Sequence, residues 1–410
     1  MVPVAVYDCA VTRDESTGIP TILFGAFDRH NFGDLLFPHI AAALLEDKHC
    51  IFAGLAASDM RPYGGHQVRA LAELSTQCRD RQVNIMHVGG ELLGCDAREA
   101  AVMLLPPDQA QEAIKHFDQH PQEKLEWARG KLGIPALAPY TIGHELFPHA
   151  ASVTYNAVGG VDLDQRDPAL RAEVLSNLKA ADVVTVRDKR TQWLLALAGI
   201  TAKLLPDPAV MLAELFGARI RERAAQMSTE FARGYIAVQF SVEFGDDETL
   251  AEIASRLDEV AHSTGYGVVF FRAGAAPWHD DLLSYQRAAA RMRSASVKIF
   301  TSLDVWDICA LIAGSRVYCG SSLHGRIVAM AFALPRINLL HPVYGMNSTK
   351  QVEFAATWED ADMPGAVSVD ALADGVRRAL ATDSERRLQT AKRLVEHYLE
   401  GSRALRAAIK

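Results

Sequence analysis

The sequence predicts an α/β protein made of two doubly wound, Rossmann-like domains. Short apolar stretches of strand character alternate with helical stretches as far as residue 210, and the alternation restarts at Tyr235. Residues 211–234 between them are rich in Ala, Arg and Glu. Such alternation is typical of parallel sheets that are covered by helices. A chain of 410 residues is also long enough for two domains of this kind.

The composition is that of a globular protein with a large core. Hydrophobic residues make up 49% of the chain, charged residues make up 22%, and the net charge is −8. The absence of a basic run argues against nucleic acid as a partner. The six cysteines are scattered without a C-x-x-C pair, which favours reduced thiols and a cytoplasmic protein. We expect no signal peptide, and no membrane span because no apolar run approaches ~20 residues.

The first domain is expected to cover residues 1–215. Its predicted strands are 4–7, 21–27, 50–55, 84–90, 152–158, 182–186 and 203–205. Its predicted helices are 35–45, 67–74, 97–132 with breaks at prolines, 167–179 and 189–198. In the long loop 133–150, His144 and His149 are five residues apart, so they do not form the H-E-x-x-H zinc helix. We therefore predict no metal site there.

The second domain is expected to cover residues 232–382, followed by a helical tail at 383–410. Its predicted strands are 235–240, 268–272, 297–300, 316–320 and 337–340, and its predicted helices are 248–262, 279–293, 304–313 and 327–334. Asp360 and Asp362 resemble a metal-binding D-x-D pair, but no strand precedes them, which favours a solvated loop. The tail is amphipathic and is interpreted as one or two helices that pack back across the domains.

The segment 316–340 contains the strongest functional signal. It reads strand, polar turn, apolar helix, strand, and the turn holds Ser321, Ser322, His324 and Arg326. In a parallel sheet, ligands bind beyond the carboxyl ends of strands, beside helix N-termini that favour anions. An imidazole at such a site suits acid–base chemistry on a phosphorylated substrate. The alternative is that His324 only pairs with a backbone carbonyl.

Two earlier turns have the same character. Asn31, Gly33 and Asp34 follow the predicted strand 21–27, and Gly89 and Gly90 end the strand that starts at Asn84. Glycines at such a place let the backbone approach a ligand closely. Ordinary turn and capping chemistry remains an alternative for the Asn, Gly and Asp residues.

These landmarks together resemble the polysaccharide pyruvyl transferase family. They are Asn31-Phe32-Gly33-Asp34, Gly89-Gly90, Val186-Arg187-Asp188 with Pro206-Asp207-Pro208, and Ser322-Leu323-His324-Gly325. The resemblance implies a GT-B-like fold and an enzyme that transfers pyruvate from phosphoenolpyruvate to two sugar hydroxyls. The product is a cyclic ketal, as in exopolysaccharide biosynthesis. Phosphoenolpyruvate is the co-substrate, and no cofactor or metal is expected.

The resemblance also implies roles for individual residues. His324 is the expected general acid and Asp34 the expected base. Arg187 is expected to hold the donor's anionic groups with its planar fork. The other expected substrate-binding residues are Asn31, Gly33, Gly89, Gly90, Glu91, Asn156, Ser321, Ser322, Leu323, Gly325 and Arg326.

The chain departs from the family pattern at two positions. Glu91 stands where the glycine pair is often a triplet, which adds a carboxylate near the expected cleft. Ser322 stands where some members have arginine, so Arg326 or Arg187 would have to supply that anion contact.

Two other functions remain open at the level of sequence. A GT-B glycosyltransferase would place a nucleotide-sugar diphosphate at residues 322–326, and a sugar-binding protein of the same fold would have no chemistry. The acceptor can be a polysaccharide unit, a lipid-linked sugar or a small glycoside.

Overall fold

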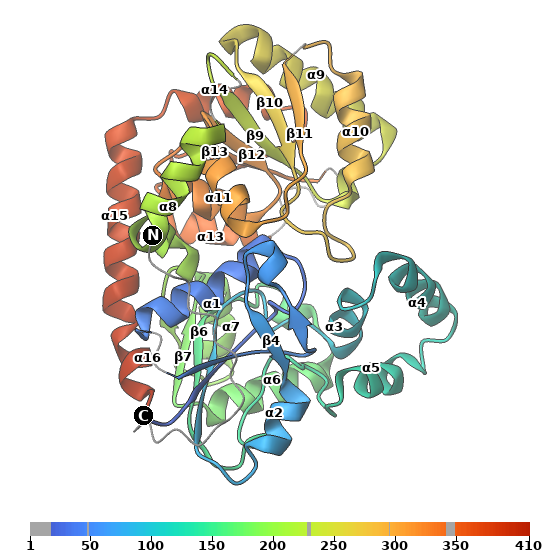
Figure 1. The fold of residues 1–410 in the computed structure, drawn as a ribbon, viewed down its shortest axis with the longest axis vertical. Coiled ribbons are helices and arrows are strands. Elements are labelled where there is room, and N and C mark those ends of the chain that lie inside the picture. Colours follow the sequence, from blue (N-terminus) through green and yellow to red (C-terminus); the bar gives the residue numbers. More distant parts are fainter. Residues whose placement is uncertain (1–17, 47–48, 228–230, 295, 342–348) are drawn as a thin grey trace.

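The computed structural model describes residues 18–46, 49–227, 231–294, 296–341 and 349–410. The predicted strand 4–7 lies outside these residues. Figure 1 shows two α/β domains, one above the other, and a long C-terminal helix along one side of both. The predicted fold class is therefore confirmed.

The first domain is built on an eight-stranded sheet with the order β3-β4-β2-β1-β5-β6-β7-β8. β3 pairs antiparallel with β4, and the other pairs are parallel. The strands are β1 (Thr21–Phe24), β2 (Cys50–Gly54), β3 (Ser58–Asp59), β4 (Gln67–Ala70), β5 (Val83–His87), β6 (Ala150–Val158), β7 (Val183–Val186) and β8 (Lys203–Leu204).

The helices of this domain follow the strands in the predicted order. They are α1 (Phe32–Leu44), α2 (Leu71–Gln77), α3 (Ala97–Met103), α4 (Pro107–Gln119), α5 (Lys124–Leu132), α6 (Pro168–Ala180) and α7 (Lys189–Leu197). The prediction of a helix over 67–74 was wrong for its first half. Residues 67–70 pair with β2 and β3 instead, because so short a segment carries no decisive periodicity and its sheet neighbours determine its structure.

The second domain has a six-stranded sheet with the order β11-β10-β9-β12-β13-β14, in which every pair is parallel. The strands are β9 (Tyr235–Gln239), β10 (Gly267–Phe271), β11 (Val297–Phe300), β12 (Val317–Gly320), β13 (Arg336–Leu339) and β14 (Ala366–Val367). The helices are α9 (Asp247–Thr264), α10 (Leu282–Arg291), α11 (Val305–Ala313), α12 (Leu323–Ala331), α13 (Lys350–Trp358) and α14 (Leu372–Leu380).

Two connections join the domains. α8 (Leu212–Met227) leads out of the first domain and packs on α11 of the second. The tail forms α15 (Ser384–Gly401) and α16 (Arg403–Ala408), and α16 contacts β6 in the first domain. The tail thus packs across both domains, as predicted (Figure 1). Among the helices of the described residues, none has the length and apolar character needed to cross a membrane.

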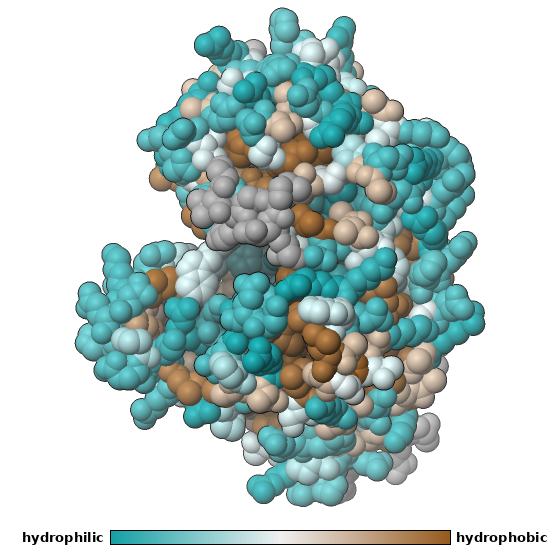
Figure 2. All heavy atoms as spheres, turned by 180° about the vertical axis from the view of Figure 1, so that it is seen from behind, coloured by the Kyte–Doolittle hydropathy of each residue, from teal (hydrophilic) through white to brown (hydrophobic). Residues whose placement is uncertain are grey.

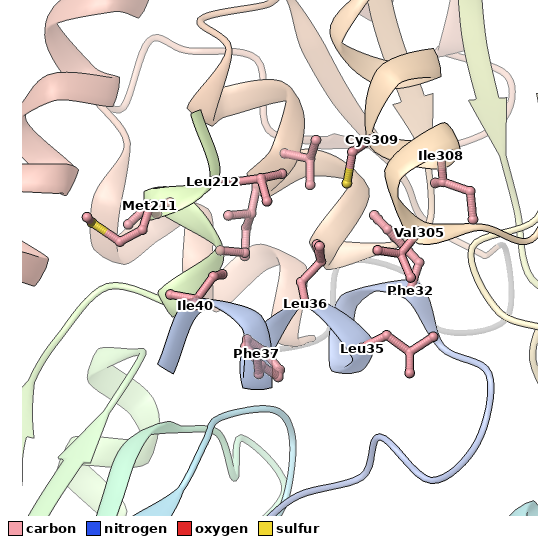
Figure 3. Close-up of a cluster of buried hydrophobic side chains, with 14 of the residues drawn as sticks. Phe32, Leu35, Leu36, Phe37, Ile40, Met211, Leu212, Val305, Ile308 and Cys309 are labelled. Atoms are coloured by element: carbon pink, nitrogen blue, oxygen red, sulfur yellow. The ribbon is translucent and has the colours of Figure 1, made fainter. Parts of the chain in front are cut away.

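One hydrophobic cluster continues from one domain into the other. Figure 3 shows Phe32 of α1 beside Val305 of α11, whereas Ile40 at the other end of α1 lies beside Met211 and Leu212, where α8 begins. All of these side chains are buried. The remaining core lies in two further clusters, one within each domain. The domains are therefore held together by apolar burial as well as by the chain connections.

The strand order places the two principal turns at equivalent points of the two sheets. In the first sheet β1 lies between β2 and β5, and in the second sheet β9 lies between β10 and β12. At both points the chain switches from one side of the sheet to the other. Such switch points open a crevice at the carboxyl ends of the strands, which is the usual ligand site of this architecture.

Candidate functional site

A cavity of about 730 Å³ lies between the two domains. Figure 2 shows the cleft as a notch between the upper and lower halves of the molecule. The first domain contributes Arg29, Asn31, Asp34, Glu91, Arg98, Tyr140 and Arg187 to its walls. The second domain contributes Gln239, Trp278, His279, Asp280, Ser321, Ser322, Leu323, His324 and Lys350. The turns predicted to be functional therefore meet in one site.

His324 lies at the N-terminus of α12. Ser322 caps this helix, and its Oγ accepts a hydrogen bond of 3.2 Å from the Gly325 N–H. His324 follows the first helical residue, and its side chain is 11% exposed. Among the described residues, no acceptor binds the backbone N–H groups of Leu323 and His324. The helix thus presents donors and the positive end of its dipole to the cavity.

A chain of ion pairs lies behind His324. Its Nε2 is buried and stands 3.6 Å from Oδ2 of Asp207, which is longer than a hydrogen bond. The same Oδ2 accepts a bond of 2.9 Å from Nη1 of Arg187, and Nη2 of Arg187 lies 2.5 Å from Oε2 of Glu91. Two carboxylates therefore flank one buried guanidinium, and one of them also faces the imidazole.

The pKa of Asp207 reflects this environment. Burial alone would raise it, but the neighbouring His324 and Arg187 side chains and the N–H of Ala209 outweigh burial and hold the pKa below its ordinary value. Asp207 is thus a fixed negative charge beside His324.

The first domain packs directly against the imidazole of His324. Gly33 in the first turn of α1 lies so close that a Cβ there would overlap Nδ1 and Cγ of the ring. The Phe37 ring is edge-on to the imidazole, with the ring centroids 5.1 Å apart. The predicted site residues Gly33 and His324 are therefore in contact across the two domains.

Asp34 and the glycine pair lie on the same wall. Gly89 and Gly90 have φ values of +114° and +96°, which side-chain-bearing residues rarely adopt. A Cβ on Gly90 would stand 3.3 Å from Oδ1 of Asp34. The glycine pair thus allows the Asp34 carboxylate to sit against the backbone at the end of β5.

Asn31 links the two domains. It caps α1 by accepting a bond of 3.1 Å from the N–H of Gly33, and its amide nitrogen donates to Nε2 of His279, 3.0 Å away. His279 also donates from Nδ1 to the Pro277 carbonyl. The capping alternative was thus right for Asn31, whose side chain is shared between the cap and this bridge.

Hydrogen bonds from buried residues fix the turn that precedes His324. Gln239 accepts a bond of 2.8 Å from the N–H of Ser322 and donates one of 2.8 Å to Asp280. Burial raises the pKa of Asp280 to about 7, against the opposing effect of hydrogen bonds from Ala273 and Gln239. Ser321 accepts a bond from the N–H of Ser241. The turn residues are thereby fixed to the end of β9.

The model of one protein family, polysaccharide pyruvyl transferase, matches residues 141–341. This segment includes Arg187, Asp207 and the turn with His324. Residues 141–341 belong to the polysaccharide pyruvyl transferase family. The family predicted from the landmarks is thus confirmed, and the protein is an enzyme of the transferase class.

Solved structures show the same fold. UDP-GlcNAc 2-epimerase from Methanocaldococcus jannaschii has a TM-score of 0.54 at 11% identity, over 93% of this chain and 99% of that chain. The structure of this epimerase with UDP-GlcNAc and UDP has a TM-score of 0.50 at 12% identity, over 93% and 99% of the two chains. The similarity supports the GT-B type of two-domain fold. A comparison with curated proteins gives no match.

Protein groups already occupy three further polar residues that were expected to bind substrate. Arg326 is fully buried, pairs with Glu359 at 2.6 Å and donates to the Pro364 carbonyl, so the prediction that it contacts substrate was wrong. Asn156 exchanges hydrogen bonds with the Tyr398 hydroxyl of α15, and it does not line the cavity. Arg187 lines the cavity, but both of its terminal nitrogens are occupied by carboxylates.

Sequence reasoning missed several residues that shape the family's site in this chain. Asp207 was noticed only as part of a proline-flanked landmark, although its position in that landmark could have marked it as a site residue. His279 was assigned to a helix, yet Asp281 caps α10 and leaves His279 in the preceding loop. The sequence around Gln239 and Asp280 does not indicate a role in the site. Only the pairing of the strands brings Gln239 to Ser322 and Asp280 to Gln239.

Proposed function

We propose that the protein transfers pyruvate from phosphoenolpyruvate to two hydroxyl groups of one saccharide, forming a cyclic pyruvate ketal. The observation that carries this proposal is the His324 imidazole, which stands at a helix N-terminus in the cleft with a buried carboxylate behind it. The family match over this segment supports the same chemistry.

The proposed reaction has two steps that balance without a redox partner. In the first, a sugar hydroxyl adds to C2 of phosphoenolpyruvate while the C3 methylene gains a proton and becomes a methyl group. In the second, another hydroxyl of the sugar replaces the phosphate at C2. Its proton leaves with the phosphate, so the products are the ketal and inorganic phosphate.

In this reaction His324 gives the proton to C3. Histidine is the side chain most often used for general acid–base catalysis, and the carboxylate of Asp207 stands 3.6 Å from Nε2 of this one. Asp34 is the proposed base for the attacking hydroxyl, because its carboxylate lines the same cavity near Gly33 and Gly90. Positioned acids and bases of this kind contribute roughly 10²–10⁴-fold each.

The donor's charges need partners other than Arg187. Within the described part of the chain, the N–H groups of Leu323 and His324 have no acceptor, so they can bind a phosphate oxygen, as helix N-termini commonly do. Lys350 begins α13, lines the cavity, and forms no ion pair with any other residue that the structure describes. We propose that these groups bind the donor, and that Arg187 holds Asp207 in place instead.

The reaction as proposed uses phosphoenolpyruvate as co-substrate and no metal or organic cofactor. The acceptor is a saccharide unit, free or lipid-linked, and the protein is proposed to act in the cytoplasm. The five cysteines among the described residues are all free thiols, which supports a reducing compartment.

Donor binding separates this proposal from a nucleotide-sugar glycosyltransferase of the same fold. A ligand that binds only the folded protein raises its unfolding temperature. We expect phosphoenolpyruvate to do so, and UDP- or ADP-linked sugars to have no effect. Incubation with phosphoenolpyruvate and a panel of saccharides in D₂O should then release phosphate and give a methyl group that carries one deuterium. Protection by a nucleotide sugar alone would contradict the proposal.

A further inference from the structure

The cavity wall contains an arginine–tryptophan pair that the proposed chemistry does not use. Arg98 lies in the first turn of α3 in the first domain, and Trp278 lies in the loop between β10 and α10 of the second. Both line the cavity. The guanidinium carbon of Arg98 is 6.0 Å from the centre of the Trp278 ring, so the two side chains face each other across the domains.

Arg98 is a cation without a carboxylate partner among the described residues. Its Nε is buried and has no hydrogen-bond acceptor. Its neighbour Arg166 differs, because Glu99 and Asp162 bind its two terminal nitrogens at 2.9 and 2.7 Å. An arginine in a cleft that contacts an indole ring but no described carboxylate can still bind an anionic ligand. The planar fork of arginine matches carboxylate and phosphate oxygens.

Trp278 is an exposed aromatic residue on a loop that hydrogen bonds fix in place. Trp278 is 40% exposed although it lines the cleft. Its φ of +62° is unusual for a bulky residue, and strain of this kind concentrates at functional sites. The adjacent His279 fixes the loop through its bonds to Asn31 and to the Pro277 carbonyl. An exposed indole face on a fixed loop provides a flat apolar surface for the C–H face of a sugar ring.

We propose that Trp278 and Arg98 form the acceptor subsite, and that the acceptor is a saccharide that carries an acidic group. The sugar ring packs on the indole, and the acidic group pairs with the Arg98 guanidinium. That this saccharide is the acceptor rests on the proposed function. That an acidic saccharide binds at Trp278 and Arg98 does not depend on it. The acidic group is a phosphate, as in a sugar phosphate or a lipid diphosphate sugar, or the carboxylate of a uronic acid.

Binding without the donor tests this inference. The probes are glucose 1-phosphate, glucuronic acid and methyl glucoside, each with its galactose and mannose counterparts, measured by titration calorimetry and saturation-transfer NMR. We expect at least one acidic saccharide to bind more tightly than its neutral counterpart. The phosphate and carboxylate arms then identify the acidic group. Arg98→Gln should weaken that binding about 10- to 100-fold, the loss expected for one charge-assisted contact.

The chain offers a matched control pair. Arg190 and Trp193 on α7 have the same 6.0 Å separation, Trp193 is 54% exposed, and neither residue lines the cavity. Arg190→Gln and Trp193→Ala should leave saccharide binding unchanged, whereas Trp278→Ala should weaken both acidic and neutral sugars. Arg98→Gln should not change the affinity for phosphoenolpyruvate.

Any of three results would overturn the inference. The first is that no saccharide of the panel binds, and the second is that neutral sugars bind as tightly as acidic ones. The third is that Arg98→Gln binds acidic sugars with normal affinity. Weaker phosphoenolpyruvate binding in Arg98→Gln, with saccharide binding intact, would assign Arg98 to the donor and overturn it too. If an acidic saccharide binds through Arg98 but phosphoenolpyruvate neither binds nor reacts, the subsite stands and the proposed function fails. If Arg98→Gln carries out normal pyruvyl transfer and binds acidic saccharides normally, the proposed function stands and the subsite fails.

Discussion

Gly33 and His324 lie in direct contact although they belong to different domains. Gly33 is in the first turn of α1, His324 is at the start of α12, and a Cβ on Gly33 would lie 2.7 Å from Cβ of His324 and overlap the imidazole ring. The ring position therefore depends on the missing side chain of a residue in the other domain. This contact gives the N-F-G-D landmark a physical reason that is separate from substrate binding.

Replacing Gly33 with alanine should displace the imidazole. Because overpacking typically costs about 1–3 kcal/mol, we expect a loss of unfolding free energy in that range and a clear drop in turnover. Urea denaturation and single-turnover phosphate release measure the two effects. Gly130→Ala is the control, because no atom lies within 4 Å of a Cβ at that position of α5, and alanine there should stabilise the helix. A fully active Gly33→Ala variant would contradict the importance of this contact.

His324→Ala should lower turnover by about two to four orders of magnitude, because the general acid is lost. Affinity for phosphoenolpyruvate should change far less, since backbone N–H groups and Lys350 are the proposed anion partners. His324→Gln keeps hydrogen bonding but cannot donate a proton at neutral pH, so it should be nearly as inactive. Single-turnover phosphate release and a separate donor titration check this. Near-normal turnover of His324→Gln would leave the histidine only a positioning role.

Arg187→Met should destabilise the protein, because the fully buried Asp207 and the partly buried Glu91 would then lack their shared cation. Removing one partner from a buried ion pair costs about 3–5 kcal/mol. Urea denaturation at neutral pH measures the loss. Arg377→Met, which removes a solvent-exposed ion pair, serves as the control and should cause no measurable change. If Arg187→Lys keeps normal stability but loses affinity for phosphoenolpyruvate, then Arg187 binds the donor, as its position in the sequence suggested.

His66 should make the protein sensitive to mild acid. Its ring stacks on Phe52, and its buried Nε2 has no hydrogen-bond partner among the residues that the structure describes. Burial lowers its pKa from 6.5 to about 3. Between these pH values the unfolded chain binds a proton that the folded protein excludes, so stability falls as the pH falls. One such histidine contributes about 1.4 kcal/mol per pH unit.

His66→Phe should therefore make the unfolding free energy less dependent on pH between about 6.5 and 3, the range bounded by the two pKa values. His39, His87 and His279 also have lowered pKa values, so the variant should keep part of the wild-type slope. Urea denaturation at a series of pH values measures this slope. An unchanged slope would mean that His66 is protonated in the folded protein.

Most of the fold could be predicted because its signals are local. The apolar strand stretches, the helix caps and the prolines at 106 and 107 indicated the alternation, and most elements before residue 340 begin within a few residues of their expected positions. No helix or strand was predicted for β3, α13, β14 and α14. The strand at Gln67–Ala70 could not be predicted, because its strand character depends on pairing with β2 and β3.

The sequence predicted which turns form the site, but not which of their side chains remain available for substrate. Which residues would be free for substrate depended on partners distant in sequence. Arg326 pairs with a carboxylate 33 residues away, and Asn156 binds a hydroxyl 242 residues away. The pairing of His324 with Asp207 likewise requires the two domains to meet.

The hydrophobic cluster that joins the domains forms late during synthesis of the chain, because it contains residues of both α1 and α11. His30, just before α1, bonds to the carbonyl of Leu303, just before α11, and the two are 273 residues apart. At roughly 5–20 residues per second, α11 is made about 15 to 55 seconds after α1. Throughout that interval the part of the apolar face of α1 around Phe32 lacks its contacts with α11. We expect nascent chains arrested before residue 305 to be captured by chaperones that bind exposed apolar helices.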